Sequence, residues 1–491
     1  MRSARPILLS GIGLAAAMLL NACGKPPLVP NKPTGPGTWL KGIPIACSTK
    51  TTDPSGAKVS YQFDWGDNTQ SEWSEFIEGN IIFTDTHTYT AQGTYRIKAR
   101  ARNSKRRSDW SAELNVNVSA GEGQVLWWIT HIDPEEGEDS ADFSSNTFGI
   151  GPDGTTYIGC VDYGALIGRK AGGSMWKFRT REDDEFFAAP VVGESLVFIG
   201  CTNDSVYAIR FNGTRKWSRY VGSAVYAAAA LGADGTVYFH TEDSMLAAFG
   251  QDGVLRWTYP TGGGYSSPVI GADGTVYVAS SEGEVFALDP TSGTMKWSQP
   301  YRLSSNAINA SPALDPQRGV LYVADDAGSF VALHFDGTPS WQYSVGEEPS
   351  SPVIGPDGTV YVCGGGRLRA LNPETQDQKW AYAPPLFGTA STPAVSADGY
   401  VYFLVIPGRK TALQQGTDTL YAVNPDGTRR WACALGEGMS DVVISAPKIG
   451  DDGLIYVGDG TRGWCVVGLK GPAQSVWPQF QRDGANSGRA R

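Results

Sequence analysis

The chain has 491 residues, including 61 Gly and 30 Pro, and only 18% of its residues are charged. This composition is typical of a folded, turn-rich and mostly β protein. The formal net charge of −10 argues against nucleic acid as a partner, because phosphate binding needs a clustered basic surface. The seven cysteines form no Cys-x-x-Cys pair and the four histidines lack ligand spacing, so we predict no metal site.

Residues 1–22 have the layout of a secretory signal, in which Arg2 and Arg5 precede an apolar run too short for a comfortable membrane span. The following Leu20-Asn-Ala-Cys23 resembles the bacterial lipobox, whose cysteine receives diacylglycerol. The resemblance implies export and a lipid anchor on Cys23, with the outer membrane as the expected location. An uncleaved anchor and an ordinary signal are the alternatives.

Residues 23–37 are rich in Pro and predict an extended tether. In residues 38–118, short runs such as Thr94–Arg102 alternate in period two between turns, which predicts a β-sandwich. Phe63-Asp-Trp-Gly-Asp67 and His87-Thr-Tyr-Thr-Ala-Gln-Gly-Thr-Tyr95 resemble the signatures of the polycystic kidney disease (PKD) domain, an immunoglobulin-like sandwich. The resemblance implies a stalk or binding module.

Three acids of this segment, Asp64, Asp67 and Asp85, are compatible with a calcium site if they converge in the fold. We favour a structural role, because Asp and Gly suit a tight turn and Trp65 suits the sandwich core.

Residues 119–491 contain an internal repeat. Ser267-Pro-Val-Ile-Gly-Ala-Asp-Gly-Thr-Val-Tyr-Val278 recurs with few changes from Ser351 and from Thr392. Units begin near residues 146, 189, 225, 266, 310, 351, 391 and 445, and tryptophans 39 to 51 residues apart are expected to close them: Trp176, Trp217, Trp257, Trp297, Trp341, Trp380, Trp431 and Trp477. A period near 40 with four short strands predicts an eight-bladed β-propeller.

Each part of the repeat has an expected position. A Pro opens most first strands, where a missing amide donor is tolerated, and Asp-Gly forms the hairpin to the second strand. We expect Gln124–Ile129 to pair into the last blade and close the ring, and the tail from Trp477 to lie across that blade or to replace the strand. Cys160 and Cys201 occupy equivalent positions, so either a disulfide or two buried thiols is expected.

The units resemble pyrroloquinoline quinone (PQQ) type propellers, which read Asp-Gly-x-Val-Tyr-Val, then Ala-Leu-Asp, then Lys-Trp. That family includes quinone-dependent dehydrogenases and scaffolds such as the propeller lipoprotein of the outer-membrane barrel-assembly machinery. The dehydrogenases carry adjacent cysteines and a calcium set, and no two cysteines are adjacent here. We therefore expect no enzyme and no cofactor.

The loops after the second strands and between blades are predicted to share one face. Acidic and aromatic residues of these loops form the candidate binding face: Glu182, Asp183, Asp184, Glu185, Phe186, Phe187, Glu242, Asp243, Asp325, Asp326, Glu347 and Glu348. Such a face suits a basic protein segment, divalent ions or sugar, and an ordinary solvated rim is the simpler interpretation.

The sequence therefore predicts an all-β, lipid-anchored envelope protein with a protein-binding or scaffolding propeller on a PKD-like stalk. A PQQ-dependent oxidoreductase and an envelope carbohydrate-binding protein are the alternatives, and the expected partners are the membrane, through the lipid, and an envelope protein.

Overall fold

The structure is a computed structural model. It describes residues 25–41, 44–119, 123, 125–129, 147–160, 164–170, 175–181, 184–243, 245–385, 388–407, 417–436, 445–458, 463–468, 470–475, 477–483 and 486–489. Within these ranges the regular elements are β-strands, and no helix there could cross a membrane. The chain divides into two compact units, Met1–Gly121 and Glu122–Arg491. The predicted signal and Cys23 lie outside the described residues.

The first unit is a β-sandwich of a four-stranded and a two-stranded sheet. The larger sheet has the order β1 (Thr38–Leu40), β6 (Leu114–Ser119), β5 (Gly93–Arg102), β3 (Ser60–Asp64), and the smaller one pairs β2 (Pro44–Thr49) with β4 (Phe83–Thr88). Trp65 is buried in the core with Phe63 and Ile97, and the Tyr89 hydroxyl donates to the Trp65 carbonyl at 2.7 Å. The turn after Trp65 needs Gly66, whose φ is 79°.

A stack of cations and aromatic rings covers part of this unit. No sequence pattern had predicted it. The guanidinium of Arg100 lies 4.3 Å from the Trp110 ring and 5.4 Å from the Trp73 ring, and that of Arg102 lies 4.4 Å from Trp73. Each tryptophan belongs to a Ser-x-Trp-Ser segment. The serine hydroxyls of these segments accept hydrogen bonds from backbone N–H groups of β3 or β5. These two segments therefore provide hydrogen-bond acceptors for the backbone of β3 and β5, and they hold the tryptophans of the stack in position.

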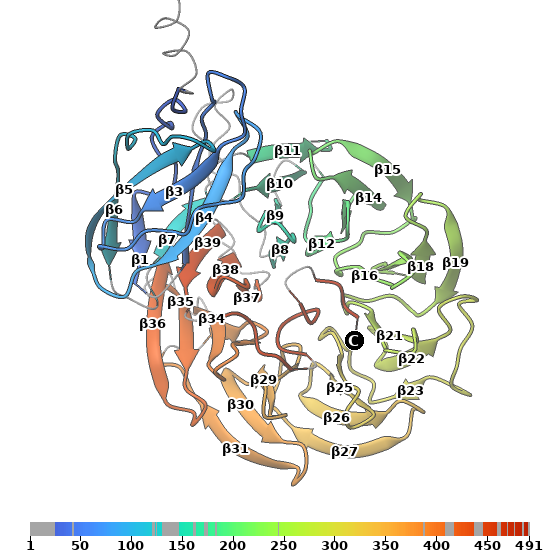
Figure 1. The fold of residues 1–491 in the computed structure, drawn as a ribbon. Coiled ribbons are helices and arrows are strands. Elements are labelled where there is room, and N and C mark those ends of the chain that lie inside the picture. The colour runs from blue at the N-terminus through green and yellow to red at the C-terminus, as the bar shows by residue number, and fades with distance from the viewer. Residues whose placement is uncertain are drawn as a thin grey trace, which may run out of the picture. The chain divides into compact units, whose positions relative to one another are not determined.

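The second unit is a ring of sheets with short strands toward its centre (Figure 1). Among the described residues it contains eight sheets, named blades 1 to 8 in chain order, and the first strands of neighbouring blades contact one another.

The strands of blades 1 to 4 follow one another from centre to rim. They are β8 (Gly149–Ile150), β9 (Thr156–Gly159), β10 (Ala165–Arg169), β11 (Met175–Arg179); β12 (Val191–Val192), β13 (Leu196–Gly200), β14 (Ser205–Arg210), β15 (Arg215–Tyr220); β16 (Ala230–Leu231), β17 (Val237–His240), β18 (Met245–Phe249), β19 (Leu255–Pro260); and β20 (Val269–Ile270), β21 (Val276–Ala279), β22 (Glu284–Leu288), β23 (Tyr301–Arg302).

Blades 5 to 8 continue the ring. They are β24 (Ala313–Asp315), β25 (Val320–Ala324), β26 (Ser329–His334), β27 (Pro339–Ser344); β28 (Val353–Ile354), β29 (Val360–Gly364), β30 (Arg367–Asn372), β31 (Asp377–Tyr382); β32 (Gly388–Ala390) and β33 (Ala394–Val395), both on β34 (Val401–Pro407), then β35 (Asp418–Val423), β36 (Arg429–Gly436); and β37 (Lys448–Ile449), β38 (Leu454–Gly458), β39 (Gly463–Val467) with β7 (Val125–Ile129).

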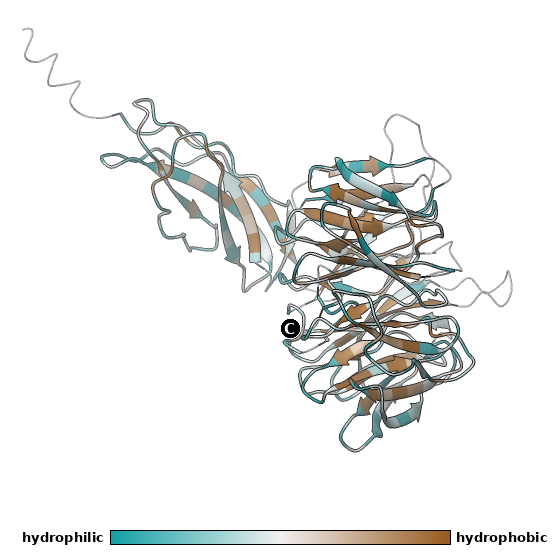
Figure 2. Cartoon of the chain, turned by 90° about the vertical axis from the view of Figure 1, so that its right-hand side faces the viewer, coloured by the Kyte–Doolittle hydropathy of each residue, from teal (hydrophilic) through white to brown (hydrophobic). Residues whose placement is uncertain are grey.

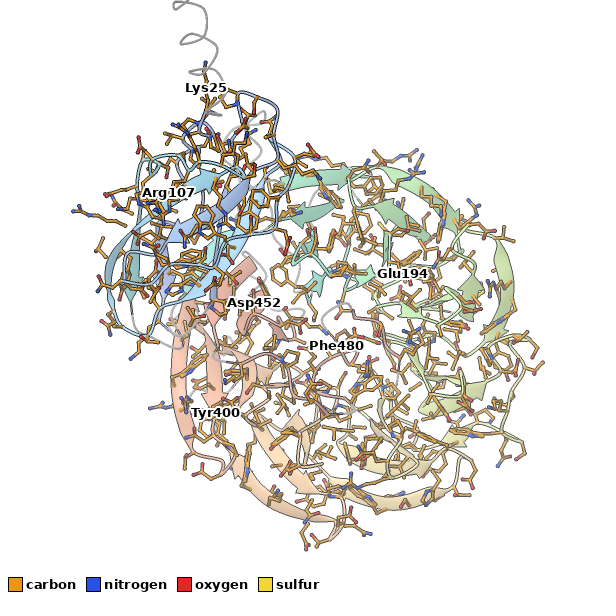
Figure 3. All side chains as sticks on the ribbon, in the orientation of Figure 1. Lys25, Arg107, Glu194, Tyr400, Asp452 and Phe480 are labelled. Atoms are coloured by element: carbon orange, nitrogen blue, oxygen red, sulfur yellow. The ribbon has the colours of Figure 1, made fainter. Side chains whose placement is uncertain are left out.

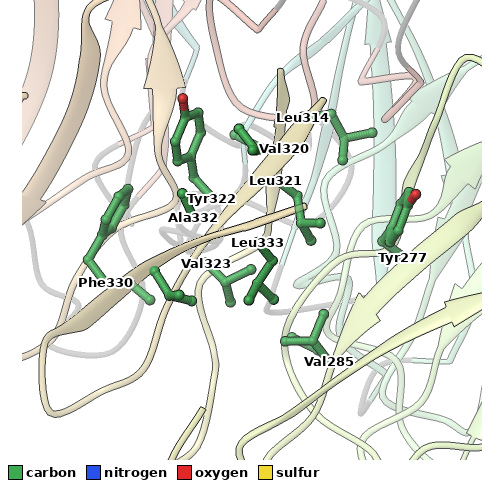
Figure 4. Packing of buried hydrophobic residues seen from close by; sticks show 14 of the residues in the cluster. Tyr277, Val285, Leu314, Val320, Leu321, Tyr322, Val323, Phe330, Ala332 and Leu333 are labelled. Carbon is green, nitrogen blue, oxygen red and sulfur yellow. The ribbon is translucent and has the colours of Figure 1, made fainter. Parts of the chain in front are cut away.

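The blades pack through their hydrophobic faces. Figure 2 shows apolar residues concentrated in the strands and hydrophilic ones in many of the loops. Between blades 4 and 5, Tyr277 and Val285 join one buried cluster with Leu314, Leu321 and Leu333 (Figure 4). Burying side chains of this size contributes roughly 1.5–3 kcal/mol each, so packing between blades stabilises the ring.

Four of the closing tryptophans, Trp217, Trp257, Trp297 and Trp380, connect their blade to the next one by a hydrogen bond. The indole N–H of Trp217 donates to the Gln251 carbonyl at 2.8 Å, and that of Trp257 donates to the Pro290 carbonyl at 2.9 Å. The ring covers a glycine of the same turn: a Cβ on Gly253 would lie 2.8 Å from Trp217. The glycine therefore supplies both a positive φ and the space for the neighbouring indole.

The ring closes through the N-terminal strand of the unit, as expected. Strand β7 pairs antiparallel with β39 and places Trp127 opposite Cys465, the register that Trp217 has opposite Ala208 in blade 2. The predicted role of Trp477 is therefore wrong, because Trp127 takes the closing position in blade 8. Trp477 is 1% exposed and lies in the buried cluster of blades 4 to 6.

The six described cysteines, Cys47, Cys160, Cys201, Cys363, Cys433 and Cys465, are buried and form no disulfide. The disulfide alternative for Cys160 and Cys201 is therefore not present. Burial raises the pKa of the Cys201 thiol to about 12, so this thiol is protonated and unreactive at neutral pH.

Candidate functional site

Successive strands of a blade are antiparallel, so its loops alternate between the two ends of the sheet. The loops after the second strands and those between blades share one face, which we call the upper face. The turns between first and second and between third and fourth strands share the lower face. This alternation decides which loop residues of different blades are neighbours.

A row of three aromatic rings crosses the upper face. Phe187, Tyr226 and Tyr265 come from the successive loops that lead into blades 2, 3 and 4. Their ring centroids lie 5.4 Å apart for Phe187 and Tyr226 and 5.2 Å apart for Tyr226 and Tyr265. Tyr265 is 44% exposed, so the row ends on an open surface. We call these three residues the aromatic row.

Carboxylates surround the aromatic row. The Tyr265 hydroxyl donates to Glu242 at 2.6 Å, and this hydrogen bond, together with burial and the Glu242 charge, raises the pKa of Tyr265 to about 12. Burial and the charges of Glu242, Glu185 and Asp243 raise the pKa of Tyr226. The electrostatic potential at the row is therefore negative, and it favours a cation.

A second acidic group lies at blade 5. Burial, followed by the charges of Asp325 and Glu348, raises the pKa of Asp326 despite a hydrogen bond of 2.7 Å from the Asn309 amide. Asp325 is 0% exposed: its Oδ1 accepts from the Ser329 amide at 2.8 Å, and its Oδ2 has no hydrogen-bond partner among the described residues. A buried carboxylate oxygen without a partner is costly.

On the lower face, several acids of the hairpins between first and second strands are paired with cations. Asp273 Oδ2 lies 2.9 Å from Lys296 Nζ, and Asp357 and Lys379 form the same pair at 2.9 Å. Burial alone would raise the pKa of Asp273, but hydrogen bonds from Thr275 and Lys296 outweigh it and lower this pKa to about 2. The charges of these hairpin acids are therefore compensated by cations of the same chain.

The structure brings together only part of the predicted binding face. Glu242, Asp243, Phe187 and Glu185 gather around the aromatic row, and Asp326 lies near Glu348. The Asp184 carboxylate accepts from the Asn203 amide at 2.7 Å, and Glu347 is exposed. Glu182 and Asp183 lie outside the described residues.

Two predicted members of the face are corrected. Phe186 is 0% exposed and packs in the core of blades 1 and 2, because successive residues of an extended loop point in opposite directions. Asp325 is buried instead of exposed. Tyr226 was missed. It stands three residues before Ala229, as Phe187 stands before Pro190 and Tyr265 before Pro268, so aligning the repeats could have found it.

The axis of the ring is occupied by the C-terminal tail, of which residues 470–475, 477–483 and 486–489 are described. Backbone amides of the innermost strands donate to tail carbonyls: Val395 to Pro478 at 2.8 Å, Ile354 to Trp477 at 2.6 Å and Ile270 to Gly488 at 2.7 Å. Figure 1 shows the tail inside the ring, and Figure 3 labels Phe480 near its centre. The expectation that the tail crosses or completes the last blade is therefore wrong.

One charged side chain holds the tail in place. The Lys448 ammonium of β37 is fully buried and donates to the carbonyls of Phe480 and Asp483. Burial lowers the pKa of Lys448 to about 7. The carbonyl groups of the tail thus replace the water molecules that would otherwise hydrate the Lys448 ammonium.

A cavity of about 470 Å³ lies on the first unit and is lined by Trp73, Phe83, Gln70, Asp85 and His87, among others. Near it, Asp67 accepts from Thr69 and lies 2.7 Å from His87 Nε2. No group of three potential metal ligands occurs in the described part of the chain, so the calcium alternative gains no support. The cavity is the place in this unit that suits the carbohydrate-binding alternative.

The repeated blades, the filled axis and the preceding sandwich define a PQQ-like β-propeller protein with an N-terminal PKD domain. A family model described as outer membrane protein assembly factor BamB matches residues 111–315, 261–414 and 302–458. The chain belongs to this family, and a PKD domain model matches residues 34–118. No curated protein matches the chain.

Two solved propeller structures show the fold of the second unit. BamB from Moraxella catarrhalis has 16% sequence identity and a TM-score of 0.56, over 70% of this chain and 98% of that one. The Dos1 propeller has 9% identity and a TM-score of 0.55, over 72% and 98%. The PKD domain of an M14-like peptidase from a Thermoplasmatales archaeon has 31% identity and a TM-score of 0.18, over 19% and 97%.

Proposed function

We propose that this chain is a non-catalytic lipoprotein of the bacterial cell envelope, anchored through Cys23, whose propeller binds a protein partner and whose PKD domain acts as a stalk. The observation that carries the proposal is the filled axis. The central channel is where a propeller can enclose a small ligand, and here residues of the tail bond to innermost strands there. The partner protein therefore binds to the loops on one of the two faces of the ring.

The family supports a scaffolding role, since its model carries the description of an assembly factor. Fold alone does not decide function, so the oxidoreductase alternative has to be judged on the axis and on the cysteines. Cys160 and Cys201, which come nearest to a pair by repeat position, are separate buried thiols. Neither the tail in the axis nor the two separate thiols favours quinone chemistry.

Photo-cross-linking in cells tests the binding role. A photoreactive amino acid replaces Asn309 on the upper face or Asp252 on the lower face, one at a time, in the full chain. We expect irradiation to give discrete adducts with envelope proteins from at least one face. Absence of protein adducts from both positions, with the chain present at normal levels, would overturn the proposal.

The anchor has its own test. Cys23→Ser removes the thiol to which the expected diacylglycerol attaches, and the chain should lose labelling by a fatty acid. Unchanged labelling would contradict a lipid on Cys23.

A further inference from the structure

Building on the proposed binding function, we propose that the upper face of blades 2 to 5 binds an extended cationic segment of a partner protein, whose Lys or Arg side chains lie against Phe187, Tyr226 and Tyr265. This inference names the site and the chemistry of the partner.

The aromatic row supplies the first argument. A cation gains energy over an aromatic face within about 6 Å of the ring centre, and the three rings stand 5.4 and 5.2 Å apart. Their loops come from successive blades, so the row follows the ring from one blade to the next. Several cations of one chain can therefore contact it at the same time.

The absence of local counter-charges supplies the second argument. Among the described residues, no ion pair involves Glu242, Asp243, Asp326, Glu347 or Glu348. Several acids of the lower-face hairpins do have partners, as for Asp234 and Arg256 at 2.6 Å. The chain thus neutralises these hairpin acids by itself and leaves the carboxylates near the aromatic row and Asp326 for an external cation.

The buried oxygen of Asp325 supplies a third, independent argument. Its Oδ2 is shielded from solvent and has no hydrogen-bond partner among the described residues, and its charge acts on Asp326. An ammonium or guanidinium group delivered beside Asp326 would complement this buried charge through space, because charges interact more strongly in a protein interior than in water.

The spacing favours an extended chain. In an extended segment, residues i and i+2 point to the same side and lie about 6.6 Å apart along the chain, close to the separation of neighbouring rings. Alternate Lys or Arg residues would therefore meet successive positions of the row. Residues between them would point away from the propeller.

The test uses the purified full chain and a fluorescein-labelled peptide of four Arg-Ser repeats, with a Glu-Ser peptide of equal length as the charge-reversed probe. The double variant Glu242→Gln/Asp243→Asn removes two charges at the row. Asp252→Asn/Asp336→Asn removes two charges from lower-face turns, where Asn can keep the hydrogen bonds that Asp252 and Asp336 accept from backbone amides, and it is the matched control. Tyr226→Ala tests the rings separately.

We expect the Arg-Ser peptide to bind with an affinity that falls as salt rises, and the Glu-Ser peptide not to bind. Glu242→Gln/Asp243→Asn should weaken binding at least tenfold and Tyr226→Ala at least fivefold, while the control variant changes it less than twofold. Unfolding midpoints show whether each variant is folded, and the Glu242/Asp243 variant, at a half-buried and an exposed residue, keeps the test valid if Tyr226→Ala does not fold.

Three results would overturn the inference: no binding of the Arg-Ser peptide, equal weakening in the control variant, or displacement of the peptide by spermine at an equal concentration of positive charge. The last result would assign the site to small polycations. Photo-cross-links from the lower-face position would leave the scaffolding role intact in each case, so failure of this inference and failure of the proposed function are distinguishable.

Discussion

The side-chain amide of Asn486 donates a hydrogen bond of 2.8 Å to the carbonyl oxygen of Pro190, 296 residues earlier in the chain. It also lies 3.1 Å from the carbonyl of Phe148. One residue of the tail therefore joins blade 1 to blade 2, and other tail residues bond to blades 3, 4, 6, 7 and 8. The tail is part of the ring and not an appendage.

Asn486→Ala should destabilise the propeller by roughly 2–4 kcal/mol, because two buried carbonyls lose a donor. Equilibrium unfolding in urea measures the change. Asn424→Ala, which removes an exposed amide that bonds to Thr428 at 2.9 Å, is the control and should cost less than about 0.5 kcal/mol. Equal stabilities of the two variants would show that the tail does not hold the ring.

The contact between Gly253 and the Trp217 indole predicts a graded effect. Gly253→Ala forces an Ala into a φ of 80° and places its Cβ 2.8 Å from the indole, whereas Gly222→Ala meets the same strain at φ 83° with no atom within 4 Å. We expect a loss of about 1 kcal/mol for Gly222→Ala and at least about 1 kcal/mol more for Gly253→Ala. Thermal unfolding compares them, and equal losses would contradict a tight contact between blades.

His240 predicts a dependence of stability on pH. Its Nδ1 lies 2.9 Å from the Ser266 carbonyl and its Nε2 2.9 Å from Thr261 Oγ1, and burial lowers its pKa from 6.5 to about 4. Between these values the unfolded chain binds a proton that the folded chain does not. The contribution is therefore complete above pH 6.5 and falls by about 3 kcal/mol as the pH drops to 4.

Urea unfolding at pH 4 to 7 measures this contribution. His240→Asn keeps a donor and an acceptor but does not titrate, so its stability should change less over this interval than that of the wild type. Parallel pH profiles for the two proteins would mean that His240 is not the group responsible.

The cation–aromatic stack of the first unit predicts a local effect. Arg100→Ala removes the guanidinium next to Trp110 and Trp73 and its bonds to Gln62, and it should cost about 1–2 kcal/mol. Amide hydrogen exchange should become faster in β3 and β5 but not in the propeller. Arg96→Ala, on the same strand with a mostly exposed side chain, should leave exchange unchanged. Faster exchange in both variants alike would rule out a specific role for the stack.

Much of the fold was predictable because the repeat is local. Each Asp-Gly turn carries its own positive-φ glycine, as at Gly274 and Gly358, and each Trp spacing repeats the length of one blade. The candidate site was predictable only in part. Loop residues such as Phe186 and Phe187 have the same chemistry in the sequence, and only the side of the backbone on which each lies separates core from surface.

The sequence by itself determined the PKD-like sandwich and the blade repeat, since these depend on local patterns, and it favoured Gln124–Ile129 as the closing strand without excluding the tail. Tertiary structure alone decided the path of the tail and the position of Trp477. The partners of the tail are single backbone carbonyls and amides from many blades. Backbone groups are the same in every residue, so no sequence pattern marks the ones that the tail will meet.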